Sequence, residues 1–124
     1  MVELTPLARI IDIEYHDIVL GASQVYHDKI RVHLRDGSFI DIWFSKKIPG
    51  RFSYHWERMH LDGTIYRHDN FPDPRWKIIS TFPKHFHDGS QTQVYESSID
   101  DDPIAGLRPF MDFVRNKILD AERR

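Results

Sequence analysis

The segment RDGS at 35–38 separates two runs in which apolar and polar residues alternate. Alternation with a period of two predicts strands with one buried face, and Asp-Gly between such strands is a strong hairpin signal. A two-residue turn would place Arg31 opposite Ile42, a charge against an aliphatic side chain. A three-residue loop at 35–37 instead places Arg31 opposite Asp41 and aliphatic residues opposite one another. We therefore predict the three-residue loop, and with it an antiparallel sheet.

The segment LDG at 61–63 repeats this signal between two further strand-like runs. A three-residue loop here predicts that Glu57 lies opposite Arg67 and that His55 lies opposite Asp69, all on one face of the sheet. The other face would carry the aromatic side chains of both strands and cover a core.

The period changes near the C-terminus, where apolar residues recur on one helical face between 104 and 121. Asp102 is placed to cap this helix, and Pro103 to occupy its first position. Pro109 removes an early hydrogen bond, so we expect an irregular start or a kink there. A short helical turn is also expected at 5–6, where a threonine precedes a proline.

The chain has 124 residues, of which 40% are hydrophobic, enough for one domain over 1–124. Together the patterns predict an α+β fold: an antiparallel, hairpin-rich sheet of about 5–6 strands with a C-terminal amphipathic helix packed on it. A hairpin about 27–28 would join the first two strands. Neither a long apolar run nor a signal segment is visible, so we expect a cytoplasmic protein without membrane contact.

Residue types exclude several kinds of chemistry. The absence of cysteine excludes thiolate nucleophiles and cysteine-ligated zinc, and there is no Gly-rich phosphate loop and no GxSxG or HExxH motif. The net charge is −2, but eight Lys and Arg residues stand against four acidic ones between 46 and 87. This basic middle allows a local phosphate-binding surface. Trp43, Trp56 and Trp76 could stack on bases, although we favour core positions for them.

Five of the eight histidines lie between 54 and 90, among carboxylates and guanidinium groups. In the predicted hairpin His55, Glu57, Arg67 and Asp69 share one face. A carboxylate beside an imidazole raises its basicity, and a guanidinium stabilises a phosphate or an oxyanion, so the group could perform acid–base catalysis. The alternative is a solvated face with cross-strand ion pairs, each worth roughly 0.2–1 kcal/mol. The sequence leaves both open.

His85 and His87 form a second pair, which an extended segment projects to one side. Two imidazoles can bind a metal or divide the roles of acid and base. A stable metal site needs a third and usually a fourth ligand, and none lies at a diagnostic spacing. Metal ligation, a structural role and metal-free catalysis stay open, but for want of further ligands we expect no metal and no other cofactor.

Two segments, HWERMHLDGTIYRHDN at 55–70 and WKIISTFPKHFHDGS at 76–90, resemble the TumE family, the toxins of a type II toxin–antitoxin system in archaea and bacteria. The resemblance extends over most of the chain, from the first hairpins to the C-terminal helix. It implies a toxin that acts with a separate cognate antitoxin protein. It picks out residues 55–58, 62–63, 67–70 and 82–89, and the polar members of this set are candidates for function.

The resemblance and the residue types together suggest a metal-independent endoribonuclease. His55, oriented by Asp69, would transfer one proton, and a histidine of the second pair the other. Arg67, held by Glu57, would contact the phosphate. The predicted catalytic residues are His55, Glu57, Arg67, Asp69, His85 and His87, and the predicted substrate-binding residues are Arg58 and Lys84.

Two alternatives remain. The chain could be a non-catalytic module whose basic middle binds the antitoxin, RNA or another macromolecule. It could also be a metal hydrolase with histidine ligands. One geometric condition tests the ribonuclease hypothesis, because His55 and the second histidine pair cannot share one scissile phosphate if they lie on opposite faces of the sheet.

Overall fold

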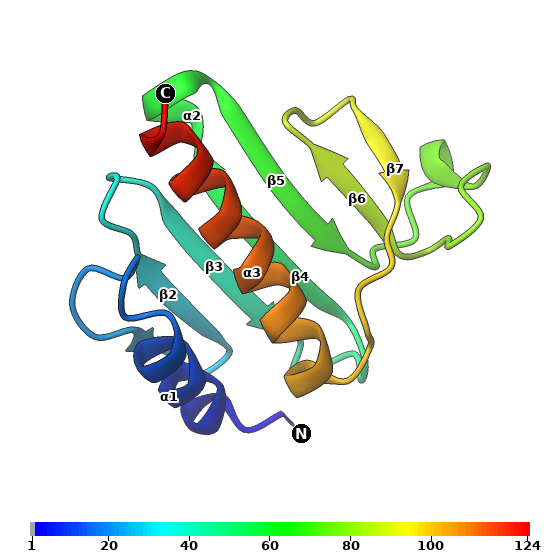
Figure 1. The fold of residues 1–124 in the computed structure, drawn as a ribbon. Helices are drawn as coiled ribbons and strands as arrows, with labels where there is room; N and C mark the ends of the chain where they lie inside the picture. Colours follow the sequence, from blue (N-terminus) through cyan, green and yellow to red (C-terminus); the bar gives the residue numbers. More distant parts are fainter. Residues whose placement is uncertain (1) are drawn as a thin grey trace.

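Seven strands form one sheet in the computed structural model, which describes residues 2–124 (Figure 1). Each strand is antiparallel to the next, and their order in the sheet is their order in the sequence. The strands are β1 (Gln24–Val25), β2 (Lys29–His33), β3 (Phe39–Phe44), β4 (Phe52–Arg58), β5 (Thr64–Asp69), β6 (His85–Asp88) and β7 (Val94–Glu96). The prediction of about 5–6 strands was slightly low, because the edge strand β7 is too short for alternation to reveal it.

Two helices, α1 (Leu4–Glu14) and α3 (Pro103–Glu122), cover the same face of this sheet, with α3 running across the middle strands (Figure 1). As predicted, α3 begins at Pro103, and the side chain of Asp102 caps it by accepting the backbone N–H three residues on. The helix is continuous through Pro109, so the irregular start that we expected is not observed. The two remaining helical segments are short: α2 (Met59–Asp62) and the 3₁₀ turn η1 (Pro74–Trp76).

The core lies between these helices and the sheet. The α3 residues that face it are Leu107, Phe110, Met111, Val114 and Ile118. Two residues predicted on that face, Ile104 and Ala121, are instead exposed near the helix ends. At the N-terminus, α1 is longer than the predicted turn, and it buries Leu7 and Ile11, one helical turn apart. Among residues 2–124 no helix is long and apolar enough to span a membrane.

The hairpin of β2 and β3 has the predicted register. Arg31 lies opposite Asp41, and two of its nitrogens donate to the carboxylate at 2.8 and 2.7 Å. Val32 lies opposite Ile40. Gly37 takes a φ of 93°, the left-handed conformation that the loop requires. Complementary pairs on both faces therefore predicted this register correctly.

The register predicted for β4 and β5 is wrong by two residues. His55 lies opposite Arg67, and Glu57 opposite Ile65. The reason is α2, since its helical turn lengthens the connection between the strands and moves every β5 residue relative to β4. A slip of two residues preserves which side chains share a face, whereas a slip of one would exchange the faces. The predicted faces are therefore right although the predicted pairs are not.

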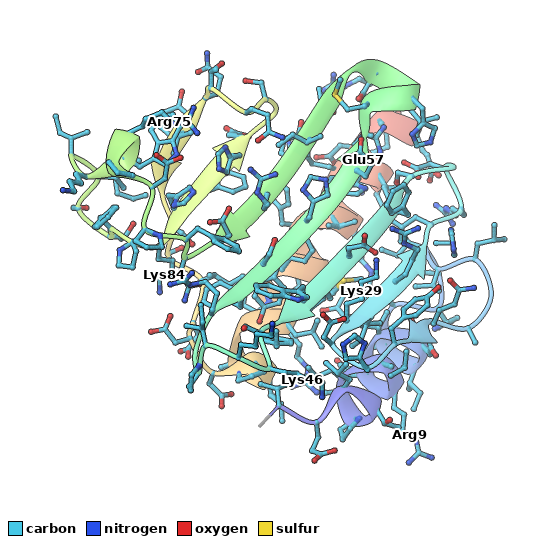
Figure 2. The ribbon with its side chains drawn as sticks, turned by 180° about the vertical axis from the view of Figure 1, so that it is seen from behind. Arg9, Lys29, Lys46, Glu57, Arg75 and Lys84 are labelled. Carbon is cyan, nitrogen blue, oxygen red and sulfur yellow. The ribbon has the colours of Figure 1, made fainter. Side chains whose placement is uncertain are left out.

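The sheet face that α1 and α3 leave open carries the polar side chains of the central strands. Figure 2 shows this face from behind the view of Figure 1, with Lys29 and Glu57 on it. The open face of β4, β5 and β6 holds His55, His85 and His87 together with Glu57 and Asp69, whereas His68 lies on the other face against α3.

Candidate functional site

Two rows of side chains cross the open face over β4, β5 and β6. His55, Arg67 and His87 occupy directly opposite positions on the three strands. In the neighbouring row Asp69 lies opposite His85. Because successive side chains alternate between faces, all five lie on one face. The second histidine pair thus returns to the hairpin, and the geometric condition for one shared site is met.

Asp69 is the buried centre of this arrangement, with 3% of its surface exposed. Its carboxylate accepts hydrogen bonds from Nε of Arg67 at 2.9 Å and from the backbone N–H of Phe71 at 3.0 Å. Nε2 of His85 lies 3.3 Å from one carboxylate oxygen, and Nε2 of His87 lies 3.8 Å from the other. One carboxylate is therefore shared by an arginine and two histidines.

Both histidines present the same nitrogen to Asp69. Nδ1 of His85 lies 2.8 Å from the carbonyl oxygen of Pro83, and Nδ1 of His87 lies 3.0 Å from that of Gln91. A carbonyl oxygen only accepts, so each Nδ1 carries a proton and each Nε2 is directed at the carboxylate. Burial, reinforced by the nearby guanidinium, lowers the pKa of His87 to about 4. This ring is neutral at neutral pH and holds a lone pair on Nε2.

His55 is held from both sides. Its Nε2 lies 3.1 Å from Oε1 of Glu57, and Arg67 donates from Nη1 to its Nδ1 at 3.3 Å. An arginine only donates, so the lone pair is on Nδ1 and the proton on Nε2. Burial raises the pKa of Glu57, but hydrogen bonds from the backbone N–H of Met59 and from His55 bring it below its usual value. His55 is thus paired with Glu57 and not, as predicted, with Asp69.

Arg67 joins the two groups. Its Nε contacts Asp69, its Nη1 contacts His55, and its Nη2 donates to Oε1 of Gln91 at 2.7 Å. The prediction that Glu57 holds Arg67 is wrong, because in the observed register Glu57 lies opposite Ile65 and Arg67 lies opposite His55. The guanidinium lies instead between a His–Glu pair and the Asp–His–His group.

A pocket of about 330 Å³ opens beside the Asp–His–His group. Its lining residues are Arg67, Asp69, Phe71, Asp73, Arg75, Trp76, His85, His87, Gln91 and Thr92. The ring of Trp76 lies 6.3 Å from that of His85 and 6.1 Å from that of His87, measured between centroids. The link between β5 and β6 therefore folds back beside the histidines through η1.

Sequence reasoning missed several of these lining residues. Phe71, Asp73 and Arg75 lie in a proline-containing link that shows no periodicity. Trp76 was read as core, whereas it lines the pocket; of the other two tryptophans, Trp56 is a core residue and Trp43 is partly exposed and stacks on Phe71. The one available signal was the gathering of aromatic and charged residues directly after a strand that carries candidate catalytic residues.

Arg58 and Lys84, the predicted substrate-binding residues, do not line this pocket. Arg58 donates to Asp36 at 2.6 Å and to Asp62 at 3.1 Å, near the α2 connection. The ammonium of Lys84 contacts the carbonyl oxygen of Ile99 and the carboxylate of Asp101. Both cations are held in contacts of their own away from the Asp–His–His group.

Asp69, His85 and His87 form a group that could hold a metal ion. One potential ligand atom from each residue lies within 4.8 Å of the other two, and all three residues are buried. Sequence spacing did not reveal this group, because Asp69 lies on β5 and is brought to the two histidines only by strand pairing. The fold thus places a third potential ligand beside the two histidines.

The comparisons with known proteins identify the family. The family model described as toxin TumE matches residues 6–118, nearly the whole chain. No curated protein and no solved structure matches this chain. The match covers both segments that carry the resemblance seen in the sequence. It also covers the hairpin of β2 and β3, the link between β5 and β6, and most of α3. The chain therefore belongs to the TumE toxin family.

Proposed function

We propose that this toxin is an endoribonuclease whose active site lies on the open face of β4, β5 and β6. Membership of the TumE family makes the chain a toxin of a toxin–antitoxin system and implies a cognate antitoxin. The observation that carries the proposal is the position of Arg67, whose guanidinium contacts both His55 and Asp69. A phosphate bound there would have a proton-transfer group on one side and the Asp–His–His group on the other.

The reaction is cleavage of RNA by its own 2′-hydroxyl. The 2′-oxygen forms a bond to phosphorus, the bond from phosphorus to the 5′-oxygen breaks, and the products are a 2′,3′-cyclic phosphate and a free 5′-hydroxyl. A base must take the 2′-proton, the charge on the phosphorane must be stabilised, and the leaving oxygen must be neutralised. The neighbouring His55, Arg67 and Asp–His–His group support the assignment of these three roles.

His55 and Arg67 fit the first two roles. When Arg67 turns from Nδ1 of His55 to a bound phosphate, that nitrogen becomes free to accept the 2′-proton. Glu57 then stabilises the imidazolium through Nε2. The guanidinium meanwhile pairs with the phosphate oxygens, a contact that its planar fork suits.

The leaving oxygen would lie on the opposite side of Arg67, near His85 and His87. His55 and His87 are two strands apart, which is about 10 Å between their backbones, so their side chains can approach one phosphate from two sides. A proton or a metal ion held by the Asp–His–His group would neutralise the leaving oxygen. A metal-independent reaction, which the residue types suggest, uses the proton.

The test uses the purified full chain and 5′-labelled RNA. We expect cleavage that leaves 2′,3′-cyclic phosphates, and we expect His55→Ala and Arg67→Ala each to lower the rate at least about 100-fold. His27→Ala is the matched control, since this side chain is 81% exposed and lies in the turn between β1 and β2, at the far edge of the sheet. It should cleave at the wild-type rate.

Two outcomes would overturn the proposal. One is a preparation that is toxic in cells yet leaves RNA intact. The other is toxicity that survives His55→Ala but is lost in Arg67→Glu, which would instead support a non-catalytic module that binds RNA or the antitoxin.

A further inference from the structure

We propose that Asp69, His85 and His87 bind one divalent transition-metal ion of the zinc class. The donor set would be Nε2 of each histidine and the carboxylate of Asp69. Two imidazoles and one carboxylate are a ligand set that zinc and other divalent first-row metals accept. The proposal rests on how these three side chains are held, not on their spacing in the sequence.

The distances suit a metal centre with only small movements. Nε2 of His85 lies 3.3 Å from one oxygen of Asp69, Nε2 of His87 lies 3.8 Å from the other, and one ligand atom from each residue lies within 4.8 Å of the other two. Ligand atoms of a tetrahedral ion lie about 3.4 Å apart when each bond is about 2.1 Å. Small rotations of the side chains would therefore bring all three donors to bonding distance, and the strands would keep their positions.

Each ligand also has the outer partner that metal ligands usually have. The carbonyl oxygens of Pro83 and Gln91 accept the Nδ1 protons of the two histidines and so direct both Nε2 atoms inward. Asp69 is fixed by the backbone N–H of Phe71. Each Nδ1 is directed at a carbonyl oxygen and each Nε2 at the carboxylate, so a cation between the two Nε2 atoms and the carboxylate would have donors on three sides.

The charges around the site do not exclude a cation. Two guanidinium groups line the pocket, but each is paired with a carboxylate: Arg67 with Asp69, and Arg75 with Asp73. Three protein ligands beside a pocket also leave coordination positions for water or substrate, which is the pattern of catalytic rather than structural zinc. The fourth ligand would then come from the solvent or from an RNA phosphate.

In the proposed ribonuclease the ion would take the role on the leaving oxygen. His85 and His87 would change from proton-transfer residues to metal ligands, and His55 would remain the base. This use of the ion rests on the proposed function, whereas its binding does not. Binding can therefore be measured without RNA, and the two proposals can fail separately.

The binding test starts from the full chain after chelator treatment and dialysis. We expect it to take up one Zn²⁺ per chain in equilibrium dialysis, and Co²⁺ to give the visible absorption of a low-symmetry site. His85→Ala, His87→Ala and Asp69→Asn should each weaken Zn²⁺ binding by more than the 10- to 100-fold that is typical when an outer partner is lost. His27→Ala should bind like the wild type. His55→Ala should bind Zn²⁺ yet lose RNA cleavage.

A second measurement covers the case in which a ligand variant does not fold. In nitrogen NMR of the wild-type histidines, Zn²⁺ should shift the Nε2 signals of His85 and His87 and leave that of His27 in place. No uptake of Zn²⁺, Co²⁺ or Mn²⁺ by the wild type, or shifts confined to other histidines, would overturn the site. Full-rate RNA cleavage by protein shown to be metal-free would overturn the role of the ion in the reaction.

Discussion

Arg67 donates a hydrogen bond to Nδ1 of His55 across two neighbouring strands, over 3.3 Å. The same guanidinium holds Asp69 through Nε. A planar fork can make both contacts at once, whereas a lysine presents one ammonium at the end of a flexible chain. Arg67 is therefore the residue through which the His–Glu pair and the Asp–His–His group are held in one site.

Arg67→Lys should accordingly fold normally but lower the rate of RNA cleavage by roughly 10- to 100-fold, because one ammonium cannot replace a forked contact. The measurement is single-turnover cleavage of labelled RNA, with circular dichroism to verify folding. Arg9→Lys, on the exposed surface of α1, should have no effect. Equal rates in Arg67→Lys and the wild type would show that the forked contact has no role.

Trp76 should bind a base of the RNA. Its ring lines the pocket beside both histidines, and η1 holds it there. Stacking of one base on an aromatic side chain is worth roughly 1–3 kcal/mol, so Trp76→Ala should raise the Kd for single-stranded RNA by roughly 5- to 150-fold. Fluorescence anisotropy of labelled RNA measures this.

Trp76→Phe is the matched control, since it keeps an aromatic face and should bind RNA within a few-fold of the wild type. If Trp76→Ala and Trp76→Phe both bound as tightly as the wild type, the pocket would not be a base-binding site.

Particular residues show how far the sequence could predict this structure. The pairing of Arg31 with Asp41 was predicted correctly because the pairs on both opposite faces of the hairpin agreed on one register. Asp69 was assigned to the wrong histidine because a four-residue helical turn lengthens the connection, and nothing local distinguishes that turn from a loop. The length of α1 was missed for a similar reason, since no side-chain hydrogen bond caps its start at Glu3.

The shared face of the candidate site residues was predicted correctly because side chains alternate along a strand. A strand alternates with period two, so the face of each candidate residue survived the error in register. The pairing of Asp69 with His85 could not be predicted, because the link between their strands has no periodic pattern from which β5 and β6 could be aligned. Sequence reasoning thus identified which side chains share a face but not which of them touch.

The turn at Asp36 should make stability depend on pH. Burial raises the pKa of Asp36, but hydrogen bonds from Ser38 and Arg58 lower it more, so the net shift is downward. A carboxyl with a lowered folded-state pKa stabilises the protein above its unfolded pKa of about 3.9, and this contribution is lost as the pH falls through the folded value. Asp36→Asn should therefore lower the free energy of unfolding at pH 6 by roughly 1.5–3 kcal/mol.

Urea unfolding between pH 2 and pH 6 checks this, and the wild type and Asp36→Asn should converge at the acid end. Asp120→Asn serves as the control, because that side chain is 60% exposed and its pairing with Arg123 lies near the end of α3. A difference between Asp36→Asn and the wild type that did not shrink on acidification would assign the effect to turn geometry and not to the charge.

Gly106→Ala should destabilise the fold although it improves helix propensity. In an exposed helix this change would stabilise by about 1 kcal/mol. Here a Cβ would lie 2.6 Å from the backbone oxygen of Asp100 and 3.0 Å from the hydroxyl of Tyr54, so α3 or the segment before it would have to move. Overpacking of this kind typically costs about 1–3 kcal/mol, and because a backbone atom cannot rotate away we expect the cost to exceed the gain. Thermal unfolding should show a lower Tm for Gly106→Ala than for the wild type. The control Asn116→Ala, an exposed substitution on α3, should not lower the Tm. A raised Tm in Gly106→Ala would mean that α3 can shift without loss of packing.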